Sequence, residues 1–197
     1  MDLGSRSGSA GKSGTDQAWS GALHRIGRGL LRIPRPLAWL PALGWAGVIF
    51  AMSSLRAPLG DLPGSGLVAF LGNLAHAFEF GVLLLLLVPV LPRTDRWVAW
   101  SACTSKLLPG LAFLFAFSDE FHQSRVPGRD ASVLDLCTDL AGILSVYYVV
   151  RLLERPDGGV PGLKRLLGKA LLVCCVCAAA ATIWGLIWKA GPWPFPS

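Results

Sequence analysis

Long apolar runs separated by short polar segments dominate the chain. Five of these runs approach the roughly 20 residues that an α-helix needs to cross a bilayer. They cover about 37–54, 68–91, 99–120, 134–153 and 169–188, and Lys106 and Pro109 interrupt the start of the third. A run such as 82–88 does not alternate between apolar and polar residues, as a membrane β-strand would. The pattern predicts an all-α fold, a polytopic transmembrane helix bundle of about five spans.

The segments outside these runs differ in composition. Residues 1–20 are rich in Ser and Gly and predict a disordered leader. Arg25, Arg28 and Arg32 recur at helical spacing, which is typical of a basic amphipathic helix on the membrane surface. The alternative is a charged segment that only orients the first span. We therefore expect a leader (1–20), a basic amphipathic juxtamembrane segment (21–36), a four-span core (37–153), a basic cytoplasmic loop (154–168), a fifth span (169–188) and a C-terminal tail (189–197).

Charge refines this picture. The chain is 53% hydrophobic and only 15% charged, which excludes an ordinary water-soluble domain. Its net charge of +6 does not indicate nucleic-acid binding, because the basic residues flank the apolar runs and suit contact with the lipid bilayer. With the N-terminus inside, the inner segments hold 13 Lys and Arg and the outer segments four, leaving Lys106 aside. This asymmetry predicts a cytoplasmic N-terminus and an extracytoplasmic 119–133 loop.

Ionisable residues concentrate at one position along the chain. Residues 118–130 hold three acids, two arginines and one histidine between two apolar runs. Asp135 and Asp139 follow at a spacing of four, so they share a face of the next helix, and Gly142 continues that face. His76 and Glu79 share a stripe of the second span. Because ionisable groups inside a membrane are costly and usually mark a site, we expect these residues to line an outward-facing polar pocket.

The residue types suggest roles within such a pocket. The candidate catalytic residues are Glu120, His122 and Asp139, and the candidate metal ligands are Glu120, His122, Asp135 and Asp139. Arg125 and Arg129 are suited to clamp a phosphate or carboxylate. Further candidate ligand-binding residues are His76, Glu79, Gln123 and Asp135. Structural alternatives stay open, because His76 and Glu79 can pair with each other, and Asp130 or Ser132 can cap the fourth span.

Several motifs together resemble the VanZ-like family. They are Ser53-Ser54, the Asn-Leu-Ala-His-Ala-Phe-Glu-Phe-Gly segment at 73–81, Ser-Asp-Glu-Phe-His-Gln at 118–123, Val-Pro-Gly-Arg-Asp-Ala-Ser at 126–132, and the two following acids. The likeness covers about 45–150. It implies a small, multi-pass protein of the bacterial cytoplasmic membrane, in a family named after a protein associated with teicoplanin resistance. The family-like polar positions are His76, Glu79, Glu120, Gln123, Arg129, Asp135 and Asp139. Asn73 departs from the family pattern, in which we expect a lysine-containing Asp-Lys pattern before the histidine.

Three functions are compatible with these observations. The leading hypothesis is a VanZ-like membrane protein of unassigned activity that binds an anionic envelope molecule or lipid headgroup, with a link to glycopeptide antibiotic resistance. Its ligand would be a lipid-linked or cell-wall precursor. The first alternative is a membrane-embedded, metal-assisted hydrolase or transferase that acts on a lipid-linked substrate. The second is a transporter that uses His76 and Glu79 as a relay. The pattern specifies neither a cofactor nor an oligomeric state.

Overall fold

The computed structural model describes residues 25, 29, 32–55, 65–93, 98–127, 132–153 and 160–188. The long helices among them are α2 (Trp39–Ser54), α3 (Ser65–Leu87), α4 (Thr104–Gln123), α5 (Val133–Leu153) and α6 (Val160–Trp188). Two short 3-10 helices, η1 (Arg35–Leu37) and η2 (Val88–Val90), flank them. The described residues contain no β-strand beyond one isolated bridge between Arg93 and Val98. The predicted all-α bundle is confirmed.

Four of the described helices are long and apolar enough to cross a membrane, namely Arg35–Ser54, Gly66–Val90, Val133–Leu153 and Gly162–Ile187. Their outer surfaces carry exposed apolar side chains, such as Leu40, Leu171 and Ile187. In a bilayer these side chains face hydrocarbon, so their exposure costs nothing. α4 has 20 residues but is not among the four, because charged residues interrupt its apolar run.

The last helix is longer than the sequence predicts. α6 begins at Val160, so 160–168 is helical although we expected it to belong to a basic loop. Leu163 is buried and extends the apolar face of the helix, while Lys164 and Arg165 are exposed. Pro161 is tolerated because the first turn of a helix has no intrahelical partner for its backbone nitrogen. Most of the juxtamembrane segment 21–36 lies outside the described residues.

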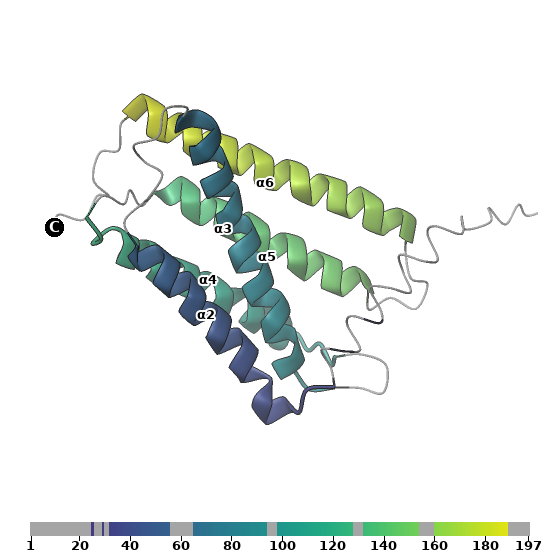
Figure 1. Cartoon of the computed structure of the whole chain (residues 1–197). Coiled ribbons are helices and arrows are strands. Elements are labelled where there is room, and N and C mark those ends of the chain that lie inside the picture. The colour runs from purple at the N-terminus through teal and green to yellow at the C-terminus, as the bar shows by residue number, and fades with distance from the viewer. Residues whose placement is uncertain are drawn as a thin grey trace, which may run out of the picture.

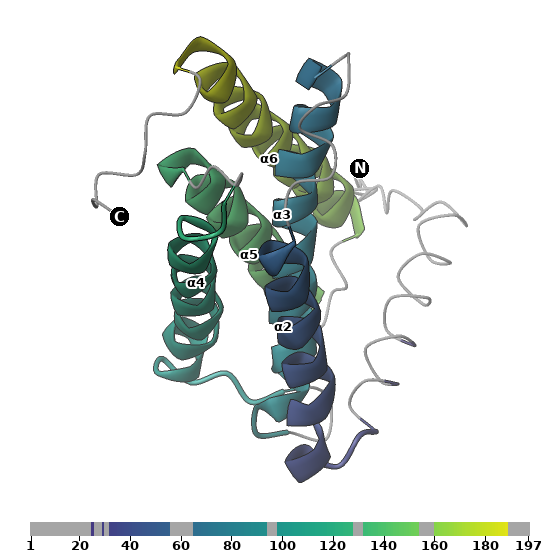
Figure 2. The same cartoon turned by 60° about the vertical axis from the view of Figure 1, so that its left-hand side comes forward.

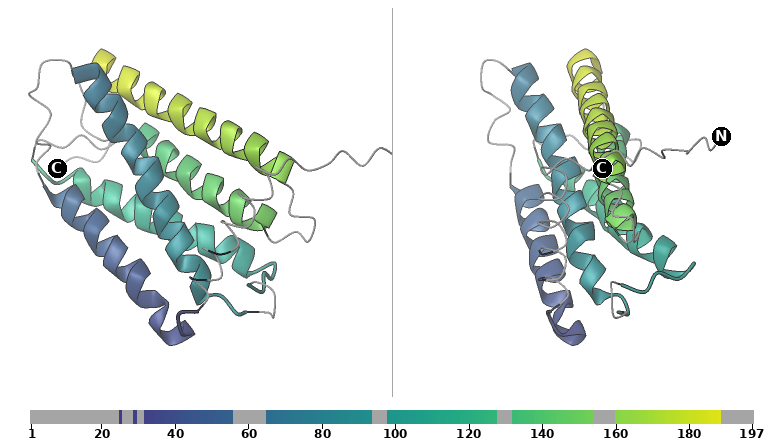
Figure 3. Two further views of the ribbon diagram at one scale, coloured as in Figure 1. Left: turned by 45° about the vertical axis from the view of Figure 1, so that its right-hand side comes forward. Right: turned by 90° about the vertical axis from the view of Figure 1, so that its right-hand side faces the viewer.

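α3 and α5 cross at the centre of the bundle (Figure 1). α6 packs against both of them, and α2 and α4 lie on the other side (Figures 2 and 3). The core between these helices is apolar and includes Phe80, Leu84, Leu108 and Ile143. This arrangement brings the middle of α3, the end of α4 and the beginning of α5 to one level of the bundle.

The crossing of α3 and α5 depends on a glycine. A Cβ atom added to Gly142 would collide with the backbone of Ala77. Small residues allow helix backbones to approach closely in membrane bundles. Gly142 lies three residues after Asp139, and Ala77 follows His76, so the close crossing also sets the separation of these two side chains.

The start of α5 is fixed by a cap. The backbone N–H groups of Leu134 and Asp135 both donate to the Ser132 hydroxyl, each at 3.2 Å. Ser132 therefore caps the helix, whereas Asp130, the other candidate, lies outside the described residues.

The opposite end of the bundle is basic: Arg93 donates to the carbonyls of Ile33 and Pro89, and Arg151 lies over the Trp100 ring.

Candidate metal centre

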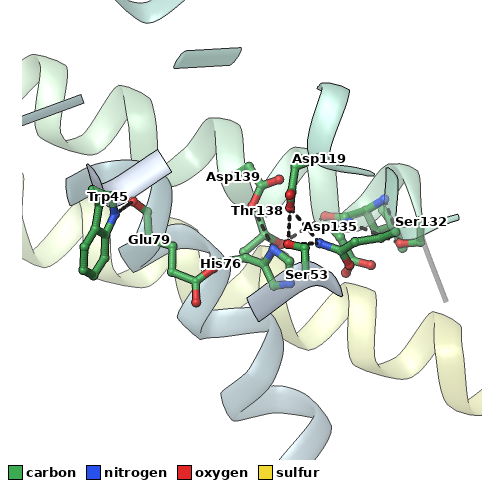
Figure 4. A network of polar contacts seen from close by, with 11 residues as sticks. Trp45, Ser53, His76, Glu79, Asp119, Ser132, Asp135, Thr138 and Asp139 are labelled. Carbon is green, nitrogen blue, oxygen red and sulfur yellow. Dashed lines mark hydrogen bonds and ion pairs between the residues drawn. The ribbon is translucent and has the colours of Figure 1, made fainter. Parts of the chain in front are cut away.

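Three helices each contribute one ionisable side chain to a buried cluster. His76 comes from α3, Glu120 from α4 and Asp139 from α5, and one ligand atom from each lies within 4.8 Å of the other two. Nδ1 of His76 is 3.3 Å from Oδ1 of Asp139. Figure 4 shows these two side chains directed toward each other. Glu120 is 1% exposed and Asp139 is 0% exposed, so the carboxylates are removed from water by the protein.

The cluster contains polar atoms without hydrogen-bond partners. Nδ1 of His76 and Oδ1 of Asp139 have only each other as partners, whereas both oxygens of Glu120 and Oδ2 of Asp139 have no hydrogen-bond partner among the described residues. A carboxylate that is buried without a partner destabilises the folded state by roughly several kcal/mol, because the carboxylate loses its hydration. Buried polar groups in native proteins are almost always satisfied. The bare atoms therefore point toward a positively charged or proton-donating occupant.

A second polar network joins α2 to α4 beside this cluster. The Ser53 hydroxyl donates to Oδ2 of Asp119 at 2.7 Å, and the Gln123 amide donates to the same oxygen at 2.8 Å. The Gln123 amide also lies 3.2 Å from the Ser53 hydroxyl. All three side chains are buried. This Ser53–Asp119–Gln123 triangle holds the end of α4, and with it Glu120, against α2.

A family model described as VanZ/LLP1 matches residues 21–154. The chain belongs to the VanZ/LLP1 family. No curated protein and no solved structure matches the chain. The family match contains the whole cluster and the triangle but ends before α6.

His122 takes a different place from the other predicted metal ligands of this VanZ/LLP1 chain. Its Nε2 is 2.9 Å from the Ser54 hydroxyl, and its ring stacks on Phe50 with centroids 4.4 Å apart. It thus faces α2. The histidine of the three-residue cluster is His76, from the middle of α3, which the sequence analysis gives as a candidate ligand-binding residue.

The structure describes three further predicted site residues, Asp135, Glu79 and Arg125. Asp135 is half-buried in the first turn of α5, and its charge acts on His76, Glu120 and Asp139. Glu79 is half-buried one turn after His76, and its backbone carbonyl accepts a hydrogen bond from the Trp45 indole at 2.9 Å. Arg125 is exposed, with its guanidinium 4.1 Å from the centre of the Phe121 ring. Arg129 lies outside the described residues.

Neither Ser53 nor Asp119 is among the catalytic, metal-binding or ligand-binding candidates that the sequence analysis names individually. Ser53 has a visible signal, because it is a polar residue near the end of an apolar helix. Asp119 belongs to the charged 118–130 segment, and because α4 continues to Gln123, its side chain is buried in the bundle. The departure from the family pattern at Asn73 has a structural counterpart: its amide donates to the Thr182 hydroxyl of α6 at 3.1 Å.

The cluster has the composition of a divalent-metal site. It offers one imidazole nitrogen and two carboxylates, which are ligand types for first-row divalent ions. Three protein ligands leave coordination positions open, as in catalytic zinc sites. Three helices that pack around a shared core would hold these ligands at fixed separations. Such preorganisation favours binding, because the side chains lose little conformational entropy when the ion binds.

Proposed function

We propose that this VanZ/LLP1 membrane protein binds a divalent metal ion among His76, Glu120 and Asp139, and that the ion holds the anionic group of an envelope molecule. The observation that carries the proposal is the meeting of three ligand-type side chains, with His76 paired to one oxygen of Asp139 and the other three carboxylate oxygens buried and without a hydrogen-bond partner among the described residues. A bound cation would offset the cost of burying these carboxylates.

The sign of the charge decides between a metal and a directly bound anion. The residues that face the cluster are acidic, since Asp119 and Asp135 add their charges to those of Glu120 and Asp139. An anionic ligand alone would be repelled there. A bound cation is the largest local charge in such a site, so a site that repels anions when empty attracts them once the cation is bound. The metal therefore reconciles an acidic pocket with an anionic ligand.

The ligand class follows from the place of the cluster in the bundle. The acids lie at the end of α4 and the beginning of α5, and the Lys and Arg distribution favours an extracytoplasmic position for this end. Lipid headgroups and lipid-linked cell-wall precursors present anionic groups at that depth of a bacterial cytoplasmic membrane. Arg125 is exposed beside Phe121, and in this proposal its guanidinium would contact such a group. The VanZ resemblance adds glycopeptide resistance to the proposal as the process that this binding would serve.

Metal content of the purified full-length protein tests this proposal. The protein in nanodiscs is equilibrated with Mn²⁺ or Zn²⁺, and bound metal is measured by elemental analysis after removal of free ions. We expect stoichiometric binding by the wild type. In His76→Ala and Asp139→Asn we expect affinity to fall at least about tenfold, because each removes a ligand.

Thr138→Val is the matched control. Thr138 is fully buried beside Asp139, but its hydroxyl donates within its own helix to the Leu134 carbonyl at 3.0 Å. This variant should retain metal, and circular dichroism of each variant checks that the helices are intact. A wild type free of metal, or equal affinity in all four proteins, would overturn the proposal.

A metal-assisted hydrolase or transferase is the second candidate. It is favoured by Glu120, whose two oxygens both lack partners among the described residues. One oxygen can bind the ion while the other accepts a proton from a metal-bound water, and such water is a strong nucleophile near neutral pH. Loading the protein with Mn²⁺ and following phosphate release from lipid phosphates in the nanodisc tests this function. Activity that persists in Glu120→Gln would eliminate this role of Glu120.

A further inference from the structure

α6 turns one side toward the bundle and the other side away from it. The helix packs on α3 and α5 at the edge of the bundle, and its beginning lies beside the end of α5 (Figures 1 and 3). Its buried side chains are small or apolar and share one side of the helix, namely Leu163, Cys174, Ala178 and Ala181. The opposite side of α6 therefore faces lipid when the protein is in a bilayer.

This outward side begins with two cations and continues with apolar residues. Five side chains recur at i, i+4, i+7, i+11 and i+18 and are all exposed, namely Arg165, Lys169, Leu172, Val176 and Ile183. Helical periodicity puts them in one line opposite the buried residues, and we call this line the α6 stripe. The three apolar members are more than half exposed. The stripe thus matches the polarity of an anionic phospholipid that lies parallel to the helix.

The length of α6 sets the depth of the two cations. The helix has 29 residues, Val160–Trp188, whereas about 20 residues cross the hydrocarbon of a bilayer. Counting about 20 residues back from Trp188 reaches Lys169, and Arg165 precedes it by one turn. Both cations therefore lie at the level of the lipid headgroups, where long basic side chains keep their charge in polar surroundings while their stems cover apolar surface.

The cations have the chemistry that a lipid phosphate requires. Arginine can donate two parallel N–H groups to a phosphate, and lysine adds a compact positive charge. Gly168 lies beside both cations and is exposed, and a Cβ atom there would have open space. A headgroup can therefore approach Arg165 and Lys169 closely from this side. A second copy of the chain suits the stripe less well, because two parallel copies in one membrane would bring their cations together.

We propose that the α6 stripe binds an anionic phospholipid in the leaflet at the basic end of the bundle. Arg165 and Lys169 bind its phosphate, and Leu172 and Val176 contact its acyl chains. Basic residues at the end of a span attract anionic lipids electrostatically, and salt weakens this attraction. The site lies on a helix that follows the family region, and it does not depend on the proposed metal function.

Lipid binding to the full-length protein tests this site. The protein in detergent is titrated with phosphatidylglycerol or with phosphatidylcholine, and native mass spectrometry measures the Kd of each lipid. We expect the wild type to prefer phosphatidylglycerol, and Arg165→Gln/Lys169→Gln to bind that lipid about 10- to 30-fold more weakly. Gly168→Leu keeps both cations but fills the surface beside them, so it should also bind phosphatidylglycerol more weakly.

Arg32→Gln/Arg35→Gln is the matched control. It also removes two exposed cations, and they precede α2 at the same end of the bundle, where Arg93 donates to the Ile33 carbonyl. The affinity of this variant for phosphatidylglycerol should stay close to that of the wild type. Circular dichroism checks that each variant keeps its helices.

The contrary results are distinct from one another. Equal affinity of the wild type for the two lipids would overturn recognition of the headgroup charge. Equal losses in the two double variants would show a diffuse attraction to net charge and overturn the site. A dimer without bound lipid in the native spectra would assign the α6 stripe to a second copy of the chain. If Arg165→Gln/Lys169→Gln fails to fold, wild-type affinity in Gly168→Leu overturns the proposal.

Discussion

Gly142 sets how closely α3 and α5 approach, and so it controls the separation of His76 and Asp139. The hydrogen in place of a side chain lets the Ala77 backbone lie directly against α5. Any larger residue must push the helices apart. The candidate site therefore depends on a residue that carries no chemistry itself.

Gly142→Ala should destabilise the protein by about 1–3 kcal/mol, because overpacking forces the backbones to shift. Thermal unfolding in detergent or nanodiscs measures the effect as a lower Tm. We also expect weaker metal binding, since His76 and Asp139 would separate. Gly72→Ala is the control: a Cβ there has open space, and alanine is the better helix former by up to about 1 kcal/mol. Equal Tm values for the two variants would contradict this account.

At the scale of elements, α4 differs from its neighbours. It carries Lys106 near its beginning and Asp119 and Glu120 near its end, with an apolar stretch between them. It nevertheless packs against α2 and α5, which are long and apolar enough to cross a membrane. We therefore propose that α4 crosses with them and that neighbouring helices shield its acids, since polar residues in spans face the bundle interior.

Cysteine labelling tests this crossing. Cys103 precedes α4 and is exposed, and Ser124, just after α4, is also exposed. In a background with the other cysteines replaced by alanine, a membrane-impermeant maleimide should label Ser124→Cys in whole cells. Cys103 should react only after permeabilisation. Labelling of both positions from the same side would mean that α4 does not cross.

α6 is an addition to the family region. It follows the VanZ/LLP1 match, yet it packs on α3 and α5. Buried Ala178 and Ala181 allow a close approach, and the Asn73–Thr182 hydrogen bond joins it to α3 one turn before His76. Because hydrogen bonds between membrane helices add modest stability, packing of small residues carries most of this association.

The whole molecule has a charge asymmetry along the bundle. The acidic cluster lies at the beginning of α5, and Arg151 lies at the end of the same helix. Arg93, beyond α3, is on the basic side as well, where it bonds to the Ile33 and Pro89 carbonyls. Because arginines accumulate on the cytoplasmic side of membrane proteins, we predict that this basic end faces the cytoplasm.

The sequence by itself determined the all-α architecture, because the thickness of the hydrocarbon layer dictates the length of an apolar run. It also placed Asp135 and Asp139 on one face, since helical periodicity is local. The sequence analysis expected a loop at the start of α6 because of the charges of Lys164 and Arg165. The long side chains of these residues can extend from an otherwise apolar helix toward water, so the helix continues through them.

Only the tertiary structure decided which side chains meet. His76 and His122 are equally plausible ligands in the sequence, but the crossing at Gly142 puts His76 beside Asp139 while α4 turns His122 toward Ser54. Asp119 likewise became a buried, oriented carboxylate through Ser53, which is 66 residues away in the chain. Contacts between distant residues depend on how helix surfaces fit together, and that fit is a property of the packed bundle rather than of any one run.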